Sequence, residues 1–214
     1  MNSIALKVCC ISSVKEAELA LEKGADFLGL VGPMPSGPGI LSLEEINSIV
    51  QSIPKSAKTI LLTSEEVPLS IIKSVSQLGV SAVQIVREIP VAALKQIRSA
   101  LPDILIFSVV HVIDEHSVDT ALGYEGLADY ILLDSGKPSK GVLGGTGEVH
   151  NWNLSRIIVE RLKTPVFLAG GLNPGNVAEA ISSVKPYGVD LCSGLRTNDE
   201  WDPIKLNTFI ENLP

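Results

Sequence analysis

Eight short apolar runs, each followed by a stretch with helical spacing, constrain the fold of this chain more than any other feature. The runs are Ile4–Cys9, Phe27–Val31, Lys58–Thr63, Ala82–Val86, Ile104–Val112, Tyr130–Asp134, Val166–Leu168 and Val189–Cys192. Their continuous Val, Ile and Leu content is typical of strands that are buried on both faces. Regular alternation of strand and helix predicts an α/β protein with a parallel sheet. Eight units without an intervening domain favour a closed (β/α)8 barrel, the TIM-barrel fold, over the alternative of an open doubly wound sheet.

The helical stretches carry recognisable start signals. Ser42 precedes Glu45 by three residues, the spacing of a capping box, and the helix that follows turns Ile46 and Ile49 inward. The other expected helices are Val14–Lys23, Pro68–Gln77, Pro90–Ala100, Glu115–Leu122, Leu154–Arg161, Asn176–Ile181 and Pro203–Asn212.

Length and composition indicate one domain over residues 1–214. The 45% hydrophobic and 19% charged content is that of a globular protein with a large core. A net charge of −7 leaves no basic stripe for a nucleic-acid backbone. No apolar run approaches the roughly 18 residues of a membrane span, and no signal peptide is recognisable. We therefore expect a cytoplasmic protein, monomeric or homodimeric, that binds neither nucleic acid nor membrane.

The three cysteines do not suggest cross-linking or metal binding. Two of them, Cys9 and Cys10, are adjacent, and the third is Cys192. This number and spacing do not make a disulfide framework, and no paired CxxC motif suggests zinc. We expect no disulfide framework and no metal site.

Small residues end the last two predicted strands. Gly170 and Gly171 follow the seventh strand, and Ser193 and Gly194 follow the eighth. Turns of this kind expose backbone N–H groups, which can bind a phosphate. The loops after strands seven and eight are the usual phosphate site of a (β/α)8 barrel. We expect these four residues to bind the phosphate of a small substrate.

A long loop, residues 135–153, follows the sixth strand and contains the motif GGTG. Loops of this length in a compact domain are more often functional than idle. A GGTG motif alone is a weak signal, but this one lies on the same rim of the barrel as the glycine turns. We therefore include Gly145 and Gly147 among the candidate substrate-binding residues.

Lys7 and Cys9 lie on one face of the first strand, because side chains alternate along a strand. A lysine beside a thiol favours the thiolate, so Cys9 is a candidate base or nucleophile. The alternative is that Cys9 and Cys10 are small core hydrophobes.

Asp134 ends the sixth strand at the rim where active sites of barrels lie. Partial burial there would raise the pKa of its carboxyl group and suit it to act as a general acid. The alternative is a local cap formed with Ser135.

Two further polar residues lie in apolar strands. Gln84 is either a neutral ligand to the substrate or a core amide with satisfied hydrogen bonds. His111 lies near the active end of the fifth strand, but a lone histidine is more often a structural hydrogen-bonding residue than a catalyst. Both are candidate substrate-binding residues.

Several motifs together resemble those of the phosphoribosylanthranilate isomerase family. They are KVCCI, GADFLGLV, VQI, LLDS, GGTG followed by Trp152, LAGGLNPGNV and VDLCSG, in this order along the whole chain. The resemblance implies a TIM barrel and a cofactor-free Amadori rearrangement in tryptophan biosynthesis. In that reaction N-(5-phosphoribosyl)anthranilate becomes 1-(2-carboxyphenylamino)-1-deoxyribulose 5-phosphate. It also implies that Cys9 is the general base at C2 of the sugar and that Asp134 is the general acid at the ring oxygen.

The departures from the family pattern fall on the substrate side. The family's loop after strand two reads S-P-R, and its arginine pairs with the anthranilate carboxylate, whereas residues 36–39 here contain no arginine. The family's Q-L-H-G is replaced by Gln84–Arg87, and its S-G-V-E by Ser193–Arg196. Arg196 is expected to contact the phosphate or to replace the missing anion contact. The alternative for Arg196 is a solvated surface charge.

Two functional hypotheses follow. The first is an isomerase that acts on phosphoribosylanthranilate or on another phosphorylated sugar. The second is a non-catalytic or regulatory barrel that keeps phosphate binding, since a fold alone does not establish a reaction. The presence of both Cys9 and Asp134 favours catalysis.

Overall fold

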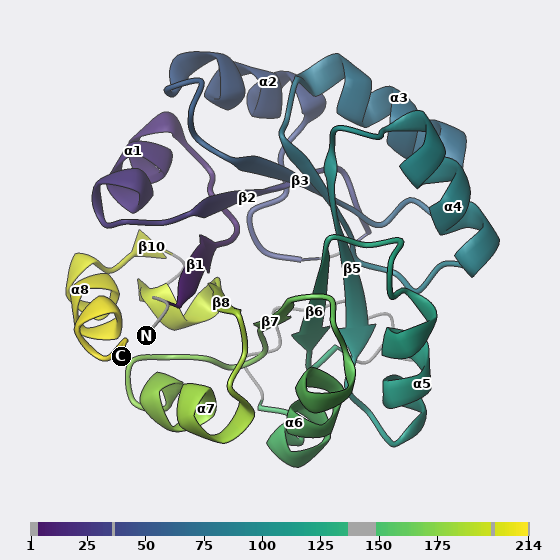
Figure 1. The fold of residues 1–214 in the computed structure, drawn as a ribbon. Coiled ribbons are helices and arrows are strands. Elements are labelled where there is room, and N and C mark those ends of the chain that lie inside the picture. Colours follow the sequence, from purple (N-terminus) through teal and green to yellow (C-terminus); the bar gives the residue numbers. More distant parts are fainter. Residues whose placement is uncertain (1–3, 36, 137–148, 198–199, 214) are drawn as a thin grey trace.

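The eight parallel strands close into a barrel in which each strand pairs with the next in sequence and the last pairs with the first (Figure 1). A computed structural model describes residues 4–35, 37–136, 149–197 and 200–213. The strands are β1 Ala5–Val8, β2 Phe27–Val31, β3 Thr59–Thr63, β4 Ala82–Ile85, β5 Leu105–His111, β6 Tyr130–Asp134, β7 Val166–Leu168 and β8 Gly188–Leu191. The predicted (β/α)8 barrel is thus confirmed. The open-sheet alternative is wrong, because β8 pairs with β1 from Ala5 to Val8.

Helices form a ring around the barrel (Figure 1). They are α1 Val14–Glu22, α2 Leu43–Ser52, α3 Pro68–Leu78, α4 Val91–Ala100, α5 His116–Gly123, α6 Trp152–Arg161, α7 Val177–Val184 and α8 Pro203–Glu211. A 3-10 turn η2, Ser193–Leu195, and a small hairpin, β9 Arg196–Thr197 with β10 Glu200–Trp201, precede α8. The longest helix in the described residues, α3, has 11 residues. No helix in this part of the chain is long and apolar enough to cross a bilayer.

Local signals place most helix ends within two residues of the predicted positions. The capping box at α2 is present: the Glu45 backbone N–H donates to Ser42 Oγ at 3.2 Å, and the Ser42 N–H donates to Glu45 Oε2 at 2.7 Å. Helix α6 begins at Trp152, two residues earlier than predicted. The Asn151 side chain caps it by accepting a hydrogen bond from the Asn153 N–H, and asparagine is a good N-cap.

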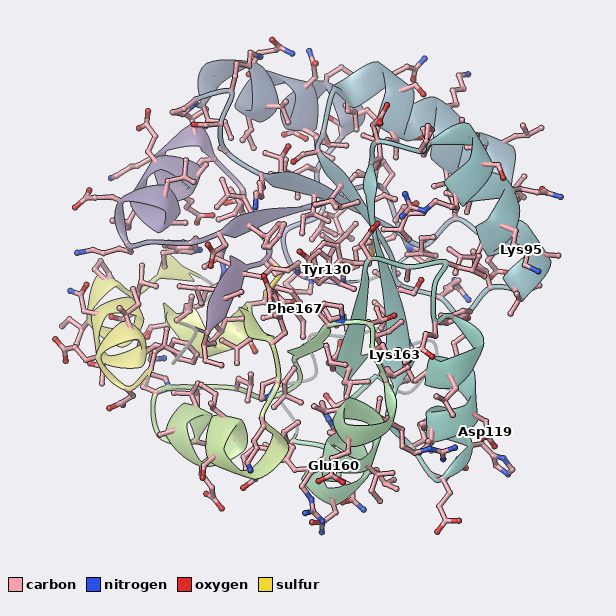
Figure 2. The ribbon with its side chains drawn as sticks, in the orientation of Figure 1. Lys95, Asp119, Tyr130, Glu160, Lys163 and Phe167 are labelled. Atoms are coloured by element: carbon pink, nitrogen blue, oxygen red, sulfur yellow. A yellow bond between two sulfur atoms is a disulfide. The ribbon has the colours of Figure 1, made fainter. Side chains whose placement is uncertain are left out.

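Aromatic side chains fill the N-terminal end of the barrel interior. Phe107 stacks on Tyr130 with ring centroids 4.5 Å apart, and Phe27 and Phe167 pack edge-on against Tyr130 at 5.8 and 5.3 Å. Figure 2 shows Tyr130 and Phe167 near the barrel axis. Because this end is packed with apolar side chains, a polar site is expected at the opposite, C-terminal end.

Candidate active site

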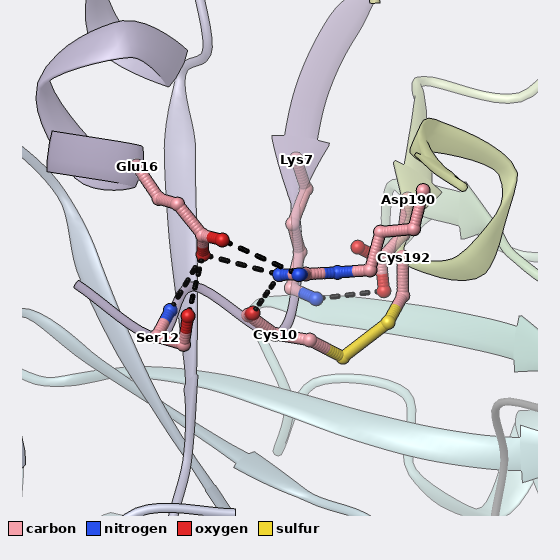
Figure 3. The surroundings of a disulfide bond; sticks show 7 residues. Lys7, Cys10, Ser12, Glu16, Asp190 and Cys192 are labelled. Atoms are coloured by element: carbon pink, nitrogen blue, oxygen red, sulfur yellow. Dashed lines mark hydrogen bonds and ion pairs between the residues drawn. A yellow bond between two sulfur atoms is a disulfide. The ribbon is translucent and has the colours of Figure 1, made fainter. Parts of the chain in front are cut away.

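A buried ion pair lies inside the barrel at the seam between β1 and β8. Lys7 Nζ lies 2.7 Å from Asp190 Oδ2, and the two side chains are 0% and 8% exposed (Figure 3). Burial opposes the charge on Lys7, but attraction to Asp190 and Cys9 outweighs it and raises the pKa of the lysine. Lys7 therefore stays protonated.

Asp190 was missed by sequence reasoning. The available signal was a single carboxylate in the apolar run Val189–Cys192. The closed barrel makes Asp190 the register partner of Lys7. Closure thus decides the pairing, and no local pattern in the sequence could show it.

Cys9 lies on the inward face that it shares with Lys7, as predicted. It is buried and is the free cysteine of the structure. Burial raises the pKa of the Cys9 thiol to about 11, although the Lys7 ammonium opposes the shift. The expected effect of the lysine has the right sign. The pKa of the thiol is nevertheless raised, because desolvation of the charged sulfur is the larger effect.

Asp134 is partly buried at the C-terminal end of β6. Burial raises the pKa of its carboxyl group, as the sequence predicted, although the Ser135 N–H and the Lys7 charge oppose the shift. Ser135 N donates to Asp134 Oδ1 at 2.7 Å, so the local contact weighed as an alternative is also present. Lys7 acts electrostatically on both Asp134 and Cys9. The same buried positive charge therefore influences both side chains.

The glycine turn after β7 lies against Asp134. Gly170 has a φ of +79°, and a Cβ there would lie 2.9 Å from Ser135 Oγ and 3.1 Å from Asp134 Oδ1. The turn after β8 in turn contacts the turn after β7, because a Cβ on Gly194 would overlap the carbonyl oxygen of Leu172. Close backbone approach of this kind requires glycine. The structure therefore brings together the four predicted phosphate-binding residues, while their binding of phosphate stays a prediction.

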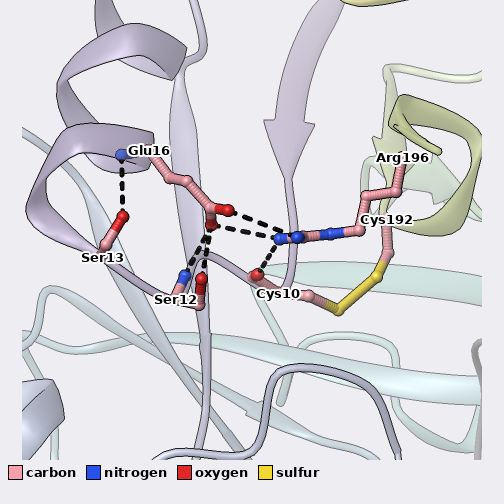
Figure 4. Close-up of polar contacts among 6 residues, drawn as sticks. All are labelled: Cys10, Ser12, Ser13, Glu16, Cys192 and Arg196. Atoms are coloured by element: carbon pink, nitrogen blue, oxygen red, sulfur yellow. Dashed lines mark hydrogen bonds and ion pairs between the residues drawn. A yellow bond between two sulfur atoms is a disulfide. The ribbon is translucent and has the colours of Figure 1, made fainter. Parts of the chain in front are cut away.

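Arg196 connects the turn after β8 to the start of α1 (Figure 4). Its guanidinium lies 3.1 Å from Glu16 Oε2 and donates to the Cys10 carbonyl oxygen at 2.7 Å. Its side chain is only 12% exposed, so the alternative of a solvated surface charge is wrong. Glu16, which sequence reasoning passed over, also accepts hydrogen bonds from the N–H and hydroxyl of Ser12. In the sequence, Glu16 could be noticed only as an acidic residue in the first turn of a predicted helix.

A disulfide joins Cys10 and Cys192, which are 182 residues apart in sequence (Figure 3). The expectation of no disulfide framework is therefore wrong for this pair. The physical reason is again barrel closure, since β1 and β8 are neighbours and the two cysteines follow their C-terminal ends. The bond ties the segment after Cys9 to the turn that contains Ser193 and Gly194.

Gln84 and His111 are buried on β4 and β5, with exposures of 4% and 1%. Gln84 Oε1 meets no donor among the described residues, which disfavours the alternative of a satisfied core amide. His111 Nε2 lies 3.1 Å from the Val86 carbonyl oxygen and must be the donor, because a carbonyl only accepts. Burial lowers the pKa of His111, so the ring is neutral near pH 7. Its Nδ1 has no partner within the part of the chain described.

An open groove lies on the rim above β2, β3 and β4. Its volume is about 430 Å³, and it is lined by Pro33, Met34, Pro35, Ser64, Glu65, Glu66, Val67 and Arg87. Arg87 Nη1 lies 3.3 Å from Glu66 Oε1, with side chains that are 34% and 61% exposed. Sequence reasoning noted residues 36–39 and Gln84–Arg87 as departures from the family pattern, but it did not identify the groove. Gly145 and Gly147 lie outside the described residues.

Comparison with known proteins agrees with this arrangement. A family model described as N-(5'phosphoribosyl)anthranilate (PRA) isomerase matches residues 6–212. The chain belongs to this family. An N-(5'-phosphoribosyl)anthranilate isomerase of Methanosarcina acetivorans is 36% identical, with 97% of this chain and 92% of the relative aligned. That of Methanocella arvoryzae is 32% identical, with 97% of both chains aligned.

Solved structures of the phosphoribosylanthranilate isomerase family share the fold. The crystal structure of the Thermotoga maritima enzyme has a TM-score of 0.84 and 30% identity, covering 98% of each chain. A family structure in complex with reduced 1-(o-carboxyphenylamino)-1-deoxyribulose 5-phosphate has a TM-score of 0.81 and 28% identity, covering 98% of this chain and 97% of that one.

Proposed function

We propose that this chain catalyses the cofactor-free rearrangement of N-(5-phosphoribosyl)anthranilate to 1-(2-carboxyphenylamino)-1-deoxyribulose 5-phosphate, a step of tryptophan biosynthesis. One observation carries the proposal: in a chain that matches this isomerase family from residue 6 to residue 212, a single buried lysine acts on both Cys9 and Asp134. The barrel thus holds a candidate base and a candidate acid around one positive charge.

The reaction requires an acid and a base on the same substrate. Asp134 donates a proton to the ring oxygen as the bond between that oxygen and C1 breaks. Cys9 then removes the proton from C2, which gives an enolamine with a double bond between C1 and C2. This enolamine gains a proton at C1 and loses the proton of its C2 hydroxyl, so that the aldose derivative becomes a ketose. Because burial raises the pKa of Asp134, this carboxyl group keeps its proton to higher pH than a solvated one.

Cys9 is a strong base once it is ionised, because burial raises its pKa to about 11. The Lys7 ammonium stabilises the thiolate, since the attraction of opposite charges is stronger away from water. Lys7 has no assigned contact with the substrate and is a positioning residue, held by Asp190 at 2.7 Å. In this scheme the substrate phosphate binds the N–H groups around Gly170, Gly171, Ser193 and Gly194.

The alternative is a barrel that binds another phosphorylated sugar, with or without turnover. Conversion by the purified protein of phosphoribosylanthranilate, followed as loss of its fluorescence, decides between the two. We expect turnover, and we expect the gene to restore growth of a tryptophan auxotroph that lacks the isomerase. Phosphate-ester binding without conversion or complementation would favour the alternative.

We also propose that the protein acts in the cytoplasm as a monomer or homodimer. A family member from Thermotoga maritima, 28% identical and with a TM-score of 0.83, is described as a dimeric enzyme from which monomers were generated. Light scattering coupled to size exclusion should give a mass of one or two copies of 22.7 kDa. A larger mass would contradict this proposal.

A further inference from the structure

We propose that Arg87 binds the carboxylate of the substrate's aromatic ring and that the groove beside it receives the ring. This inference rests on the proposed function, because it assigns one end of that substrate to a place on the rim. It names a site for an aromatic carboxylate at the ends of β2, β3 and β4, formed by residues to which the sequence analysis assigned no binding role.

The order of the strands gives the direction in which the substrate must extend. In a closed ring of eight strands, β3 lies opposite β7, and β4 lies opposite β8. The substrate has a phosphate at one end, an aromatic acid at the other, and the reacting carbons between them. With the phosphate on the turns after β7 and β8, and with Cys9 and Asp134 acting at the centre, the aromatic acid points towards the groove.

The groove offers room and apolar contacts for an aromatic ring. Its volume of about 430 Å³ lies within the usual range for small-molecule sites, about 300–1,000 Å³. The apolar residues of its lining are Pro33, Met34, Pro35 and Val67. Proline rings and a flexible thioether pack well against a flat ring, and sulfur makes favourable contacts with aromatic edges.

Arg87 supplies the positive charge of this groove, whose other charged lining residues are Glu65 and Glu66. The contact of Arg87 with Glu66 involves one guanidinium nitrogen and lies near the surface, so it contributes little stability. A guanidinium carries five N–H donors and binds a carboxylate through two of them at once. The substrate carboxylate can therefore bind Arg87 beside Glu66 or displace it.

Two other cations near the barrel mouth, Lys7 and Arg196, are engaged elsewhere. Lys7 is fully buried against Asp190, and Arg196 is held by Glu16 and the Cys10 carbonyl. Residues 36–39, in the loop that precedes α2, contain no arginine or lysine. Among these groups, Arg87 is the one that is partly exposed and lines the groove together with apolar residues.

Binding to the purified full-length chain tests the inference with two ligands. The first is reduced 1-(o-carboxyphenylamino)-1-deoxyribulose 5-phosphate, and the second is its phenylamino analogue without the carboxylate. Calorimetry should show that Arg87→Gln weakens binding of the first ligand about 10- to 100-fold, the usual loss of a charge-assisted hydrogen-bonded pair. Binding of the second ligand should change less than about threefold.

Kinetics provides a second readout of the same contact. For phosphoribosylanthranilate, Arg87→Gln should raise KM with little change in kcat, because the carboxylate is remote from the reacting carbons. Arg87→Lys should give a KM between those of the wild type and Arg87→Gln. Glu66→Gln should lower KM a few-fold, because it removes a negative charge that competes with the substrate carboxylate. Arg156→Gln is the matched control: this arginine on α6 is 50% exposed and pairs only loosely with Glu160, at 3.7 Å.

The outcomes separate the two proposals. Wild-type affinity of Arg87→Gln for the carboxylate-bearing ligand, or an equal loss for both ligands, overturns the inference about Arg87 and leaves the proposed reaction intact. A wild-type protein that neither binds the carboxylate-bearing ligand nor converts phosphoribosylanthranilate overturns the proposed function itself.

Discussion

The two sides of the barrel mouth are built differently. On the side of β7, β8 and β1, the turns are joined by a disulfide, a buried ion pair and the Arg196 contacts (Figures 3 and 4). On the side of β2, β3 and β4, the rim is an open groove with one ion pair near the surface. We refer to these as the cross-linked side and the groove side. The end of β6 belongs to the cross-linked side, because Asp134 lies against the turn after β7.

The difference matches what each side is proposed to do. Proton transfer needs groups held to within a fraction of an ångström, and rigid contacts around them provide this. Recognition of one end of a ligand needs only a cation and an apolar wall. Substitutions on the cross-linked side should therefore change both turnover and stability. Substitutions on the groove side should mainly change ligand affinity.

The largest predicted contrast is in turnover. Asp134→Asn keeps the shape of the side chain but removes the acid, and we expect kcat to fall about 10²- to 10⁴-fold, the usual contribution of a general acid. Ser64→Ala, on the groove side, should change kcat less than about threefold. Steady-state assays on the two variants make the comparison. A fall of less than tenfold for Asp134→Asn would remove this residue from the proposed mechanism.

Next in size is the effect on stability of removing the buried lysine. Lys7→Met leaves Asp190 buried without its partner, and we expect the free energy of unfolding to fall by about 3–5 kcal/mol. Urea denaturation followed by circular dichroism measures it. If the loss is below about 1 kcal/mol, the ion pair does not hold the seam together.

Reduction of the disulfide should have an intermediate effect. Because the bond closes a loop of 182 residues, breaking it should lower the free energy of unfolding by about 2–4 kcal/mol. Urea denaturation with and without dithiothreitol measures the effect, and Cys192→Ser is the control that should not respond to the reductant. Equal stability of oxidised and reduced wild-type protein would show that the bond does not stabilise this side.

The ionisation of Cys9 reports how strongly the cross-linked side excludes water. Thiolate absorbance near 240 nm, taken as the difference between wild type and Cys9→Ser, should appear with a midpoint near pH 11. A solvated cysteine titrates near pH 8.5, so the thiolate of Cys9 should be scarce at neutral pH. A midpoint below about pH 9 would mean that the attraction of Lys7 outweighs burial.

The smallest predicted effect concerns stability on the groove side. Arg87→Met repeats the cation-to-methionine change made at Lys7, but it removes an ion pair near the surface, so the loss should be about 0.5 kcal/mol or less. Thermal denaturation and urea denaturation both measure it. A loss as large as that of Lys7→Met would show that the two sides do not differ in the way described.

Much of the site could be read from local patterns. The positions of Cys9 and Asp134 at the ends of their strands, and the glycine turns after β7 and β8, follow from strand alternation and turn chemistry. The raised pKa of Asp134 also followed from its position. The pKa of Cys9 did not, because it depends on how completely the folded barrel removes the sulfur from water.

The sequence by itself determined the elements, their order and the fold class, because apolar periodicity, caps and glycines act over a few residues. The tertiary structure decided which distant side chains meet. Lys7 with Asp190, Cys10 with Cys192, and Glu16 with Arg196 are separated by 183, 182 and 180 residues. All three join the first unit of the barrel to the last. Contacts between the two ends of a chain exist only when the ring of strands closes, and no local pattern encodes them.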